Sequence, residues 1–363
     1  MRPTLFLFSF LAAFCAFPAC TDLPEPEGSG ALAISLSPRV TVQTKASDVT
    51  ERSFEKVVNQ LQLFLFKDGA RYDYISLQGN ALVFPYTRRY TSLSSGSYAV
   101  YAVANGPDLS SVTTEAQLQS RSVTLADCSL SDTKGFVMAA ANTSVSITAG
   151  ASTQVSLSLQ RFASRVQVVS IRNQVPSTYA ENGAVTIKGI FLENANSEWN
   201  LMGTGEPSSW VMLGGRVAGK QASNERSDFV SEATQVPESF RTQLYRSFAQ
   251  TIAREGTWYP DSCGLYAFPN RRTVDHTGAS ATAESGALSR LVVLARVNGA
   301  DWWYPVTLFQ QGTGLERNTS YDVTLAIRAT GSTDPNEPVS EAQLAATVTC
   351  NGWTTGHSYT ESL

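Results

Sequence analysis

Histidine is scarce in this chain, since His276 and His357 are the only two among 363 residues. No Cys-x-x-Cys pair accompanies them, so the paired ligands of a typical zinc site are missing. The Gly-x-Gly stretches at 203–205 and 312–314 do not continue into a dinucleotide or phosphate-binding fingerprint, and turns account for them. A Ser/His/Asp site assembled only by folding stays open, because sequence order does not constrain it. Since no residue pattern points to such a site, we expect the protein not to be an enzyme and to bind no metal and no cofactor.

Charge and cysteine are also sparse. The 27 Lys and Arg residues against 31 Asp and Glu leave a net charge of −4, without a basic block. This balance argues against a nucleic-acid partner. Of five cysteines, Cys15 and Cys20 belong to the leader described below, which leaves Cys128, Cys263 and Cys350. An odd number is no disulfide framework, so at most one pair can form, and we favour buried thiols.

Only one long apolar run occurs, "LFLFSFLAAFCAF" at 5–17, and it is too short to span a bilayer. It has the length of a signal-peptide core, and a basic residue precedes it. The following "FPAC" is similar to a bacterial lipobox, in which the cysteine is lipidated, although Phe17 replaces the usual leucine. We therefore expect residues 1–19 to be a signal peptide and Cys20 to carry lipid (palmitate). The alternative is a plain secretory peptide cleaved near Ala19.

The next residues, "TDLPEPEGSG", are acidic and rich in proline and glycine, which predicts a disordered tether. Acidic residues directly after a lipidated cysteine are similar to a surface-export signal of Bacteroidales lipoproteins. No later segment reaches transmembrane length, so we expect attachment to a membrane through lipid alone.

Alternation of apolar and polar residues dominates the remaining chain and predicts half-buried strands. It is clear over 321–328 and over 144–160, where "TAGASTQ" predicts the turn of a hairpin. The runs "LQLFLF" (61–66) and "SYAVYAVAN" (97–105) have apolar residues at both odd and even positions, as expected for strands covered on both faces. Residues 291–309 predict another hairpin that turns near Asn298-Gly299.

Helix signals are few. Residues 113–120, "TTEAQLQS", predict a short helix with a threonine cap. Residues 237–256 predict a longer helix, because apolar residues recur every four positions at Phe240, Leu244, Phe248 and Ile252.

The chain is therefore expected to be mostly β, with two β-sandwich-like domains and a few short helices. The boundary falls within "LQRFASRVQVV" (159–169), which gives an N-terminal domain over 46–160 and a C-terminal domain over 161–340. The proline-rich "GSTDPNEPVSE" (331–341) separates the second domain from a tail over 341–363.

Several phrases in this order resemble the fimbrillin family, the lipoprotein (type V) pilus subunits of Bacteroidales. They are "GSYAVYAVAN", "GFVMAA", "VSLSLQRFASRVQV", "VTIKGIFLEN", "LYAFPN", "LERNTSYDVTLAI" and "GSTDPNEPV". At Arg165 the family usually has lysine. The resemblance implies two transthyretin-like β-sandwich domains, export as a lipoprotein to the outer membrane, and assembly into an extracellular fimbrium that supports adhesion.

The resemblance also implies that a surface Arg- or Lys-specific protease removes the first strand. "ALAISL" (31–36) matches that strand and "TKAS" matches the loop after it. We therefore expect residues 20–45 to leave by a cut between Lys45 and Ala46, with Arg52 as the alternative. Loss of a strand exposes unpaired backbone and an apolar groove, which a strand of an identical or related subunit can fill.

The expected donor is the tail. Residues 342–350, "AQLAATVTC", alternate in the same way as residues 31–36, which predicts a strand with one buried face. The residues expected to enter the groove are Leu344, Ala346, Val348 and Cys350. The alternative is that this segment is the final strand of its own C-terminal domain.

Three other functions stay open at this point. A surface glycan-binding lipoprotein would use an exposed tryptophan, and of the adjacent Trp302 and Trp303 at most one can face outward. A surface hydrolase would use His276. Within the family, a tip or anchor subunit of the fimbrium competes with a stalk subunit.

Overall fold

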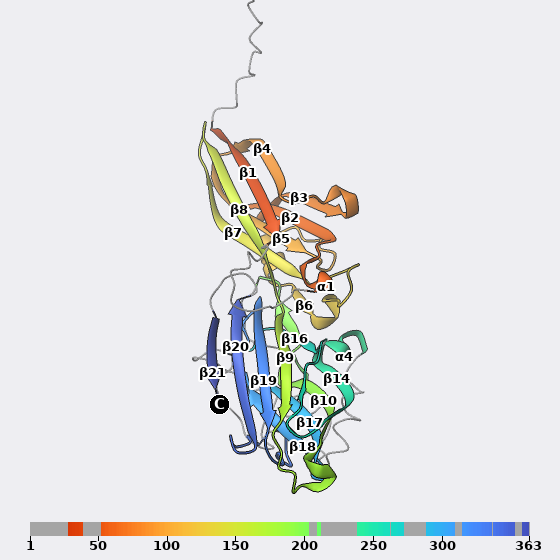
Figure 1. Ribbon diagram of the computed structural model, residues 1–363. Helices are drawn as coiled ribbons and strands as arrows, with labels where there is room; N and C mark the ends of the chain where they lie inside the picture. The colour runs from red at the N-terminus through yellow and green to blue at the C-terminus, as the bar shows by residue number, and fades with distance from the viewer. Residues whose placement is uncertain are drawn as a thin grey trace, which may run out of the picture.

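The computed structural model describes residues 28–38, 52–202, 209–211, 238–261, 263–271, 288–308, 314–335, 337–352 and 358–362. Strands make up most of them, and the helices are short. The strands form two sandwich-like units stacked along the long axis of the molecule (Figure 1). The mostly β fold class predicted from alternation is therefore confirmed.

The N-terminal unit is a single path of seven strands in the order β3-β2-β5-β7-β8-β1-β4. They are β1 (Ser29–Pro38), β2 (Gln60–Lys67), β3 (Ala70–Gln78), β4 (Tyr86–Ser94), β5 (Gly96–Ala104), β7 (Met138–Ile147) and β8 (Ser152–Arg161). The path folds over on itself, so that β1, β4 and β8 enclose one apolar cluster together with β2, β5 and β7 (Figure 1).

The predicted hairpin over 144–160 has the right strands but a different pairing. β7 and β8 pair only at the ends away from the turn, at Met138–Arg161 and Ala139–Gln160. Toward the turn, β7 stays paired with β5 whereas β8 pairs with β1. The two strands diverge into separate layers because each finds a better-placed neighbour elsewhere in the chain.

Strands β2 and β5 are buried on both faces, as their continuous apolar runs predict. In β2, Leu61, Leu63 and Leu65 lie in the cluster between the two layers, whereas Phe64 and Phe66 lie in a second cluster. That second cluster continues without a break into the core of the C-terminal unit. The two units therefore share apolar packing.

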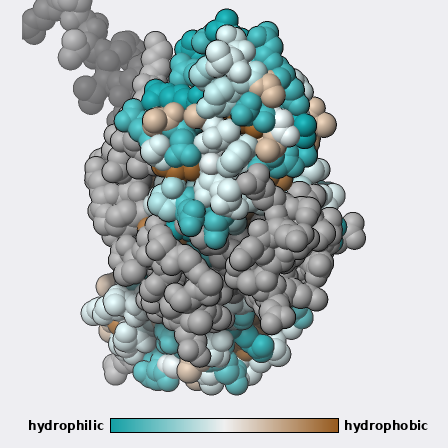
Figure 2. All heavy atoms as spheres, turned by 90° about the horizontal axis from the view of Figure 1, so that it is seen from below, coloured by the Kyte–Doolittle hydropathy of each residue, from teal (hydrophilic) through white to brown (hydrophobic). Residues whose placement is uncertain are grey.

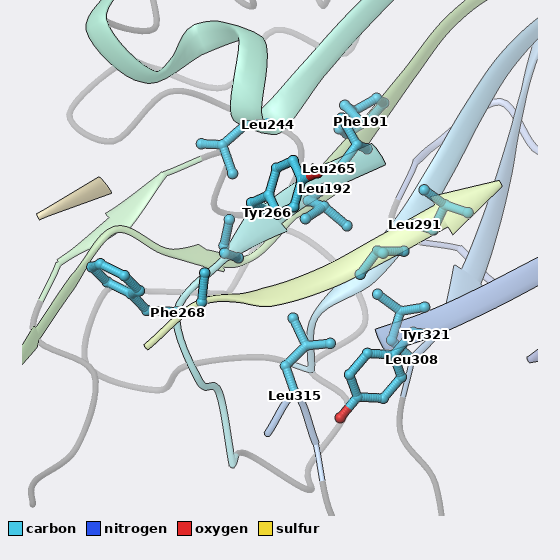
Figure 3. Packing of buried hydrophobic residues seen from close by; sticks show 14 of the residues in the cluster. Phe191, Leu192, Leu244, Leu265, Tyr266, Phe268, Leu291, Leu308, Leu315 and Tyr321 are labelled. Carbon is cyan, nitrogen blue, oxygen red and sulfur yellow. The ribbon is translucent and has the colours of Figure 1, made fainter. Parts of the chain in front are cut away.

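The C-terminal unit has two sheets, ordered β14-β10-β17-β18 and β15-β9-β19-β20-β21, with β16 also paired to β9. The strands are β9 (Ser164–Asn173), β10 (Val185–Glu193), β14 (Tyr245–Ile252), β15 (Thr257–Trp258), β16 (Gly264–Ala267), β17 (Arg290–Val297), β18 (Ala300–Thr307), β19 (Thr319–Ile327), β20 (Leu344–Gly352) and β21 (Ser358–Ser362). Figure 3 shows part of the core, where Leu244 and Tyr266 lie among the side chains that fill it.

Short strands complete the fold and bridge the two units. β6 (Ser122–Thr124) belongs to the long segment after β5, and it pairs with β12 (Glu198–Asn200) of the C-terminal half. β11 (Ala195–Asn196) pairs with β13 (Trp210–Val211). The three 3₁₀ turns are η1 (Gly79–Ala81), η2 (Leu125–Asp127) and η3 (Ala180–Gly183), counted within the described ranges.

The hairpin predicted at Asn298-Gly299 is confirmed as β17 and β18. Both turn residues have positive φ, 53° and 74°, which matches the turn that asparagine–glycine favours between antiparallel strands. Behind the turn, Trp303 is buried, whereas the half-buried Trp302 donates its indole N–H to the Val297 carbonyl at 3.0 Å. Of the two tryptophans, neither is fully exposed.

The short helix predicted over 113–120 is confirmed as α2 (Glu115–Gln119), with Thr114 accepting a hydrogen bond from the Gln117 amide. The longer helix predicted over 237–256 is wrong in its second half. Helix α4 (Glu238–Leu244) ends after seven residues, and β14 follows directly. A spacing of four suits one face of a helix and also one face of a strand, and pairing with β10 decides in favour of the strand.

Figure 2 shows the molecule from the C-terminal unit's end. The described residues on this face are mostly hydrophilic, and the few apolar ones are scattered. The large apolar side chains that are exposed within the described ranges lie apart in sequence, at Tyr72, Val83, Val169 and Tyr259. Within the described ranges, no helix is both long and apolar enough to cross a membrane. The signal peptide, Cys20, Lys45, Ala46, His276 and His357 lie outside the described residues.

Candidate functional site

Strand β1 fills a slot between two strands of the N-terminal unit. It pairs antiparallel with β4, with Ile34 opposite Arg88, and parallel with β8, with Ile34 opposite Val155. Leu32, Ile34 and Leu36 point into the core and are at most 1% exposed. Burying three such side chains contributes roughly 4.5–9 kcal/mol as an upper bound. β1 is therefore an integral strand, and its removal would uncover core.

The core beneath β1 belongs to strands that would remain without it. Leu63, Val100, Val155 and Leu157 lie in the same apolar cluster as the three β1 residues. Without β1, these side chains would face an open trench lined by the backbone edges of β4 and β8. Such a trench combines apolar surface with unpaired hydrogen-bonding groups, which is the usual acceptor of an added strand.

Strand β4 forms one wall of the slot and depends on β1 for its place in the sheet. In the part of the chain that the structure describes, β4 pairs with no strand other than β1. Side chains also hold it to β3, because Arg88 and Tyr90 both bind the Asp73 carboxylate, at 3.2 and 2.8 Å. Burial, and then this hydrogen bond, raise the pKa of Tyr90, so the phenol stays protonated and donates.

The N-terminal end of the slot is closed by the turn between β7 and β8. The Ala31 amide donates to the Ala151 carbonyl at 2.8 Å, and the Gly150 amide donates to the Ser29 carbonyl at 2.7 Å. Between these bonds, a Cβ on Gly30 would lie 3.0 Å from the Ala151 oxygen and closer still to the Thr148 oxygen. The turn therefore fixes the register of the strand in the slot.

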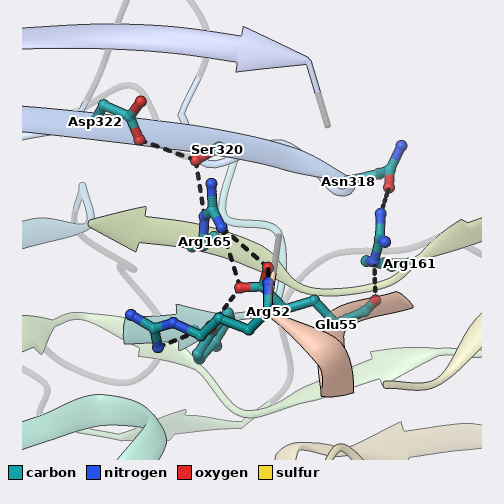
Figure 4. A network of polar contacts seen from close by, with 8 residues as sticks. Arg52, Glu55, Arg161, Arg165, Asn318, Ser320 and Asp322 are labelled. Carbon is teal, nitrogen blue, oxygen red and sulfur yellow. Dashed lines mark hydrogen bonds and ion pairs between the residues drawn. The ribbon is translucent and has the colours of Figure 1, made fainter. Parts of the chain in front are cut away.

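Helix α1 (Ser53–Lys56) places a carboxylate in the junction between the two units (Figure 4). Glu55 is fully buried and forms an ion pair with the equally buried Arg165 of β9 at 3.0 Å. Tyr266 of β16 donates to Glu55 at 2.6 Å, and the Arg52 backbone amide donates to it at 2.8 Å. One carboxylate thus joins α1 to two strands of the C-terminal unit.

The same network extends along the junction in both directions. Arg165 donates to the Ser320 hydroxyl at 3.0 Å, and Ser320 donates to Asp322 of β19 at 3.1 Å. At the end of β8, Arg161 donates to the Glu55 backbone carbonyl and reaches Asn318. Burial raises the pKa of Asp322, although the charge of Arg165 opposes this shift. The junction is a connected polar cluster within apolar packing.

Sequence reasoning found the slot strand but missed this junction. Glu55 and Arg165 are 110 residues apart, and Glu55 is one of several charged residues in "DVTERSFEK" (48–56), which does not single it out. The one available signal was Arg165 itself, a basic residue at the start of an apolar strand, where fimbrillins usually have lysine. A buried cation requires a buried partner, but the sequence does not say which carboxylate provides it.

The predicted donor residues lie in β20 within their own C-terminal unit. Leu344, Ala346, Val348 and Cys350 are buried, each at most 6% exposed, and belong to its core. β20 pairs antiparallel with β19 on one side and β21 on the other. In this single chain the segment is therefore a home strand. Its role as a donor in assembly stays a prediction. Arg52, the alternative cleavage residue, is half-buried at the junction.

The buried thiols give a simple test of the fold. Burial raises the pKa of both Cys128 and Cys263 to about 12. At neutral pH these thiols are protonated and shielded, and the thiolate is the reactive form. We expect the folded protein, purified without its leader, to leave both unreacted with iodoacetamide at pH 8, whereas denatured protein reacts at both. Mass spectrometry of the alkylated peptides measures this, and rapid labelling of either residue in the folded protein would contradict it.

A family model described as fimbrillin-A associated anchor proteins Mfa1 and Mfa2 matches residues 33–209. This confirms the resemblance to the fimbrillin family. The match begins inside β1 and runs through the whole N-terminal unit into the C-terminal one. No curated protein matches this fimbrillin-like chain by sequence.

Solved structures of fimbrial proteins have a similar fold. Fimbrilin (FimA) of Porphyromonas gingivalis W83 is 13% identical, with a TM-score of 0.58 over 90% of this chain and 98% of that one. A candidate cell adhesion protein from Parabacteroides distasonis is 16% identical, with a TM-score of 0.60 over 91% and 99%. The tip fimbrial protein Mfa3 of P. gingivalis, truncated at its C-terminus, is 13% identical, with a TM-score of 0.52 over 90% and 100%. At these identities the likeness shows the fold alone.

Proposed function

We propose that this fimbrillin-like chain is a structural subunit of a surface fimbrium, activated by removal of β1 and polymerised by strand exchange. The observation that carries the proposal is the position of β1. It is the first described strand, it fills a slot between β4 and β8, and its three apolar side chains seal the core. A strand so placed can be replaced by another extended segment with the same alternation.

In this proposal, residues 1–19 direct export and lipid on Cys20 holds the precursor on the outer membrane. The seated β1 keeps the precursor monomeric, because the slot is already filled. A surface protease with Arg or Lys specificity then frees the subunit from its lipid and from β1 in one cut. The subunit passes from the outer membrane into the extracellular fimbrium, where its partners are identical or related subunits.

The geometry around Arg52 favours the cut at Lys45–Ala46. A protease must hold several residues around the bond in extended form. The Arg52 amide is bonded to Glu55 at the start of α1, and its guanidinium lies 3.4 Å from the Tyr266 hydroxyl. A cut after Arg52 would require this part of the junction to open first. Lys45 precedes α1 in the sequence and lies outside the described residues.

The test is assembly of a Lys45→Ala variant in the producing bacterium. We expect it to reach the surface but to stay uncut and monomeric, whereas Arg39→Ala, a matched change before the cut, assembles as the wild type does. Edman sequencing of wild-type fibres should read "ASDVT". A first residue of Ser53 would move the cut to Arg52, and fibres that retain residues 20–45 would refute removal of β1.

The tail is the proposed donor, and its alternation supports this role, since β20 presents one apolar face as β1 does. A donor β20 must leave β19 and the C-terminal core before it enters another subunit. Strand exchange then replaces one set of strand pairings with another.

A tip or anchor subunit is the second candidate, because the matching family model describes anchor proteins. A stalk subunit should be found along the whole fibre, and an anchor or tip subunit only at one end. Immunogold labelling of the chain on intact fimbriae distinguishes these positions.

A further inference from the structure

The slot of β1 contains one position that admits no side chain. At Gly30, the Thr148 and Ala151 carbonyl oxygens occupy the space that a Cβ would need. The Thr148 oxygen, the nearer of the two, is held within the turn, because it accepts from the Ala151 amide at 3.1 Å, whereas the Ala151 oxygen accepts from the Ala31 amide of β1 itself. The Thr148 oxygen therefore stays in place after β1 has left, unless the β7–β8 turn opens. Any strand that fills the whole slot must therefore place a glycine there.

The remaining inward positions form three apolar pockets, filled by Leu32, Ile34 and Leu36. Since side chains of a strand alternate between faces, the glycine position and the three pockets fall on one face, two residues apart. The slot therefore selects a glycine followed at every second residue by three apolar residues. A donor strand can place this glycine and these three apolar residues in the slot while running either parallel or antiparallel to the departed β1.

The tail does not fit this pattern when it runs in the direction of β1. If Leu344, Ala346 and Val348 enter the three pockets, Ala342 falls at the glycine position, and its Cβ meets the Thr148 oxygen. If Gly352 takes the glycine position instead, Thr354, Gly356 and Ser358 fall in the pockets. Each alternative violates one of the two requirements.

The tail fits when it runs in the opposite direction. Gly352 then takes the glycine position, and Cys350, Val348 and Ala346 enter the pockets of Leu32, Ile34 and Leu36 in that order. The outward positions receive Asn351, Thr349 and Thr347, which are small or polar. Building on the proposed strand exchange, we propose that the tail of a second copy enters the slot antiparallel to the departed β1, with Gly352 locking its register.

The sizes of the side chains agree with entry of the tail only after β1 has left. Cysteine, valine and alanine are smaller than the leucine, isoleucine and leucine that they replace, so the tail buries less apolar surface than β1 does. A seated β1 therefore holds the slot against the tail. Exchange proceeds only after β1 has been cut free and lost to dilution.

Disulfide cross-linking between copies reads the direction of the donor. Ala31 of β1 lies beside Ser152 of β8, and Ser37 lies beside Ser158. In the antiparallel arrangement residue 351 therefore lies beside Ser152, whereas the same-direction arrangement places residue 349 beside Ser158. Both serines are exposed, so a cysteine there is accessible.

We expect Asn351→Cys with Ser152→Cys to give ladders of linked subunits on a non-reducing gel of assembled fibres. The matched pair Thr349→Cys with Ser158→Cys should give none. The opposite result overturns the proposed direction and leaves strand exchange standing. Fibres that assemble normally but cross-link in neither pair overturn both this proposal and the assignment of the tail as donor.

Two glycine variants test the register. Gly30→Val should lower the melting temperature of the uncut precursor whether or not exchange occurs, and an unchanged value would remove the requirement for glycine. Gly352→Val should reduce fibre mass at least tenfold, while Thr349→Val, on the opposite face of the same strand, assembles normally. Circular dichroism of each monomer confirms folding, and folded Gly352→Val that assembles normally overturns the register.

Discussion

Replacing Glu55 by alanine is expected to lower the free energy of unfolding by about 3–5 kcal/mol, because it leaves a buried arginine without its partner carboxylate. The ion pair to Arg165 is 3.0 Å long and fully shielded from water. Tyr266 and the Arg52 amide lose an acceptor in the same step. Urea denaturation followed by circular dichroism measures the loss over both units, and tryptophan fluorescence reports the C-terminal half, because all six tryptophans lie at or after Trp199. We expect both units to unfold at a lower urea concentration because the network joins them.

The matched control is Glu341→Ala, which removes the carboxylate of an exposed pair with Arg328 at 3.4 Å. Water screens this pair, so its loss should change the free energy of unfolding by about 0.5 kcal/mol or less. Equal losses in the free energy of unfolding for the two variants would show that burial does not increase the contribution of the Glu55–Arg165 pair to stability. A large effect of Glu55→Ala confined to the N-terminal unit would separate the two units energetically.

Ile34→Ala is expected to destabilise the precursor by about 2–5 kcal/mol, since the side chain is fully buried and its loss leaves a cavity. If β1 is removed during maturation, the same substitution should leave the dissociation temperature of assembled fibres unchanged. Thermal denaturation of the uncut precursor and heating of fibres in detergent measure the two quantities separately.

Leu63→Ala provides the comparison, because Leu63 lies in the same apolar cluster but in β2, which the cut does not remove. It should destabilise precursor and fibre alike. If Ile34→Ala lowers the stability of both, β1 is retained in the fibre and the proposed activation is wrong. The pair of variants thus separates a strand that leaves from a strand that stays.

Local chemistry explains why much of the fold could be predicted. Asn298-Gly299 identified its hairpin because few residues adopt positive φ twice in succession. Alternation placed β19 and continuous apolar runs placed β2 and β5, since one-sided and two-sided burial each leave a direct trace in the sequence. The helix over 237–256 failed because a spacing of four fits both periods, and only pairing with β10 distinguishes them.

The features that could not be predicted depend on distant partners. Strand β7 diverges from β8 because β1 pairs along one edge of β8. The sequence of the predicted hairpin alone does not indicate this pairing. The Glu55–Arg165 pair likewise joins a four-residue helix to a strand of the other unit. The slot strand could be found because "ALAISL" resembles the first strand of fimbrillins and its side chains alternate, whereas its glycine requirement appeared only when the backbone oxygens around it were placed.

The direct passage from β8 into β9 has a mechanical consequence. Only Phe162 and Ala163 separate the two strands, both are fully buried, and the strands follow one another along the long axis (Figure 1). Domains move relative to one another where an exposed, flexible linker joins them, whereas here apolar packing and a buried ion pair cross the junction. The chain should therefore resist bending at the junction between its two units. If copies join into a filament as proposed, curvature would be concentrated where one copy meets the next.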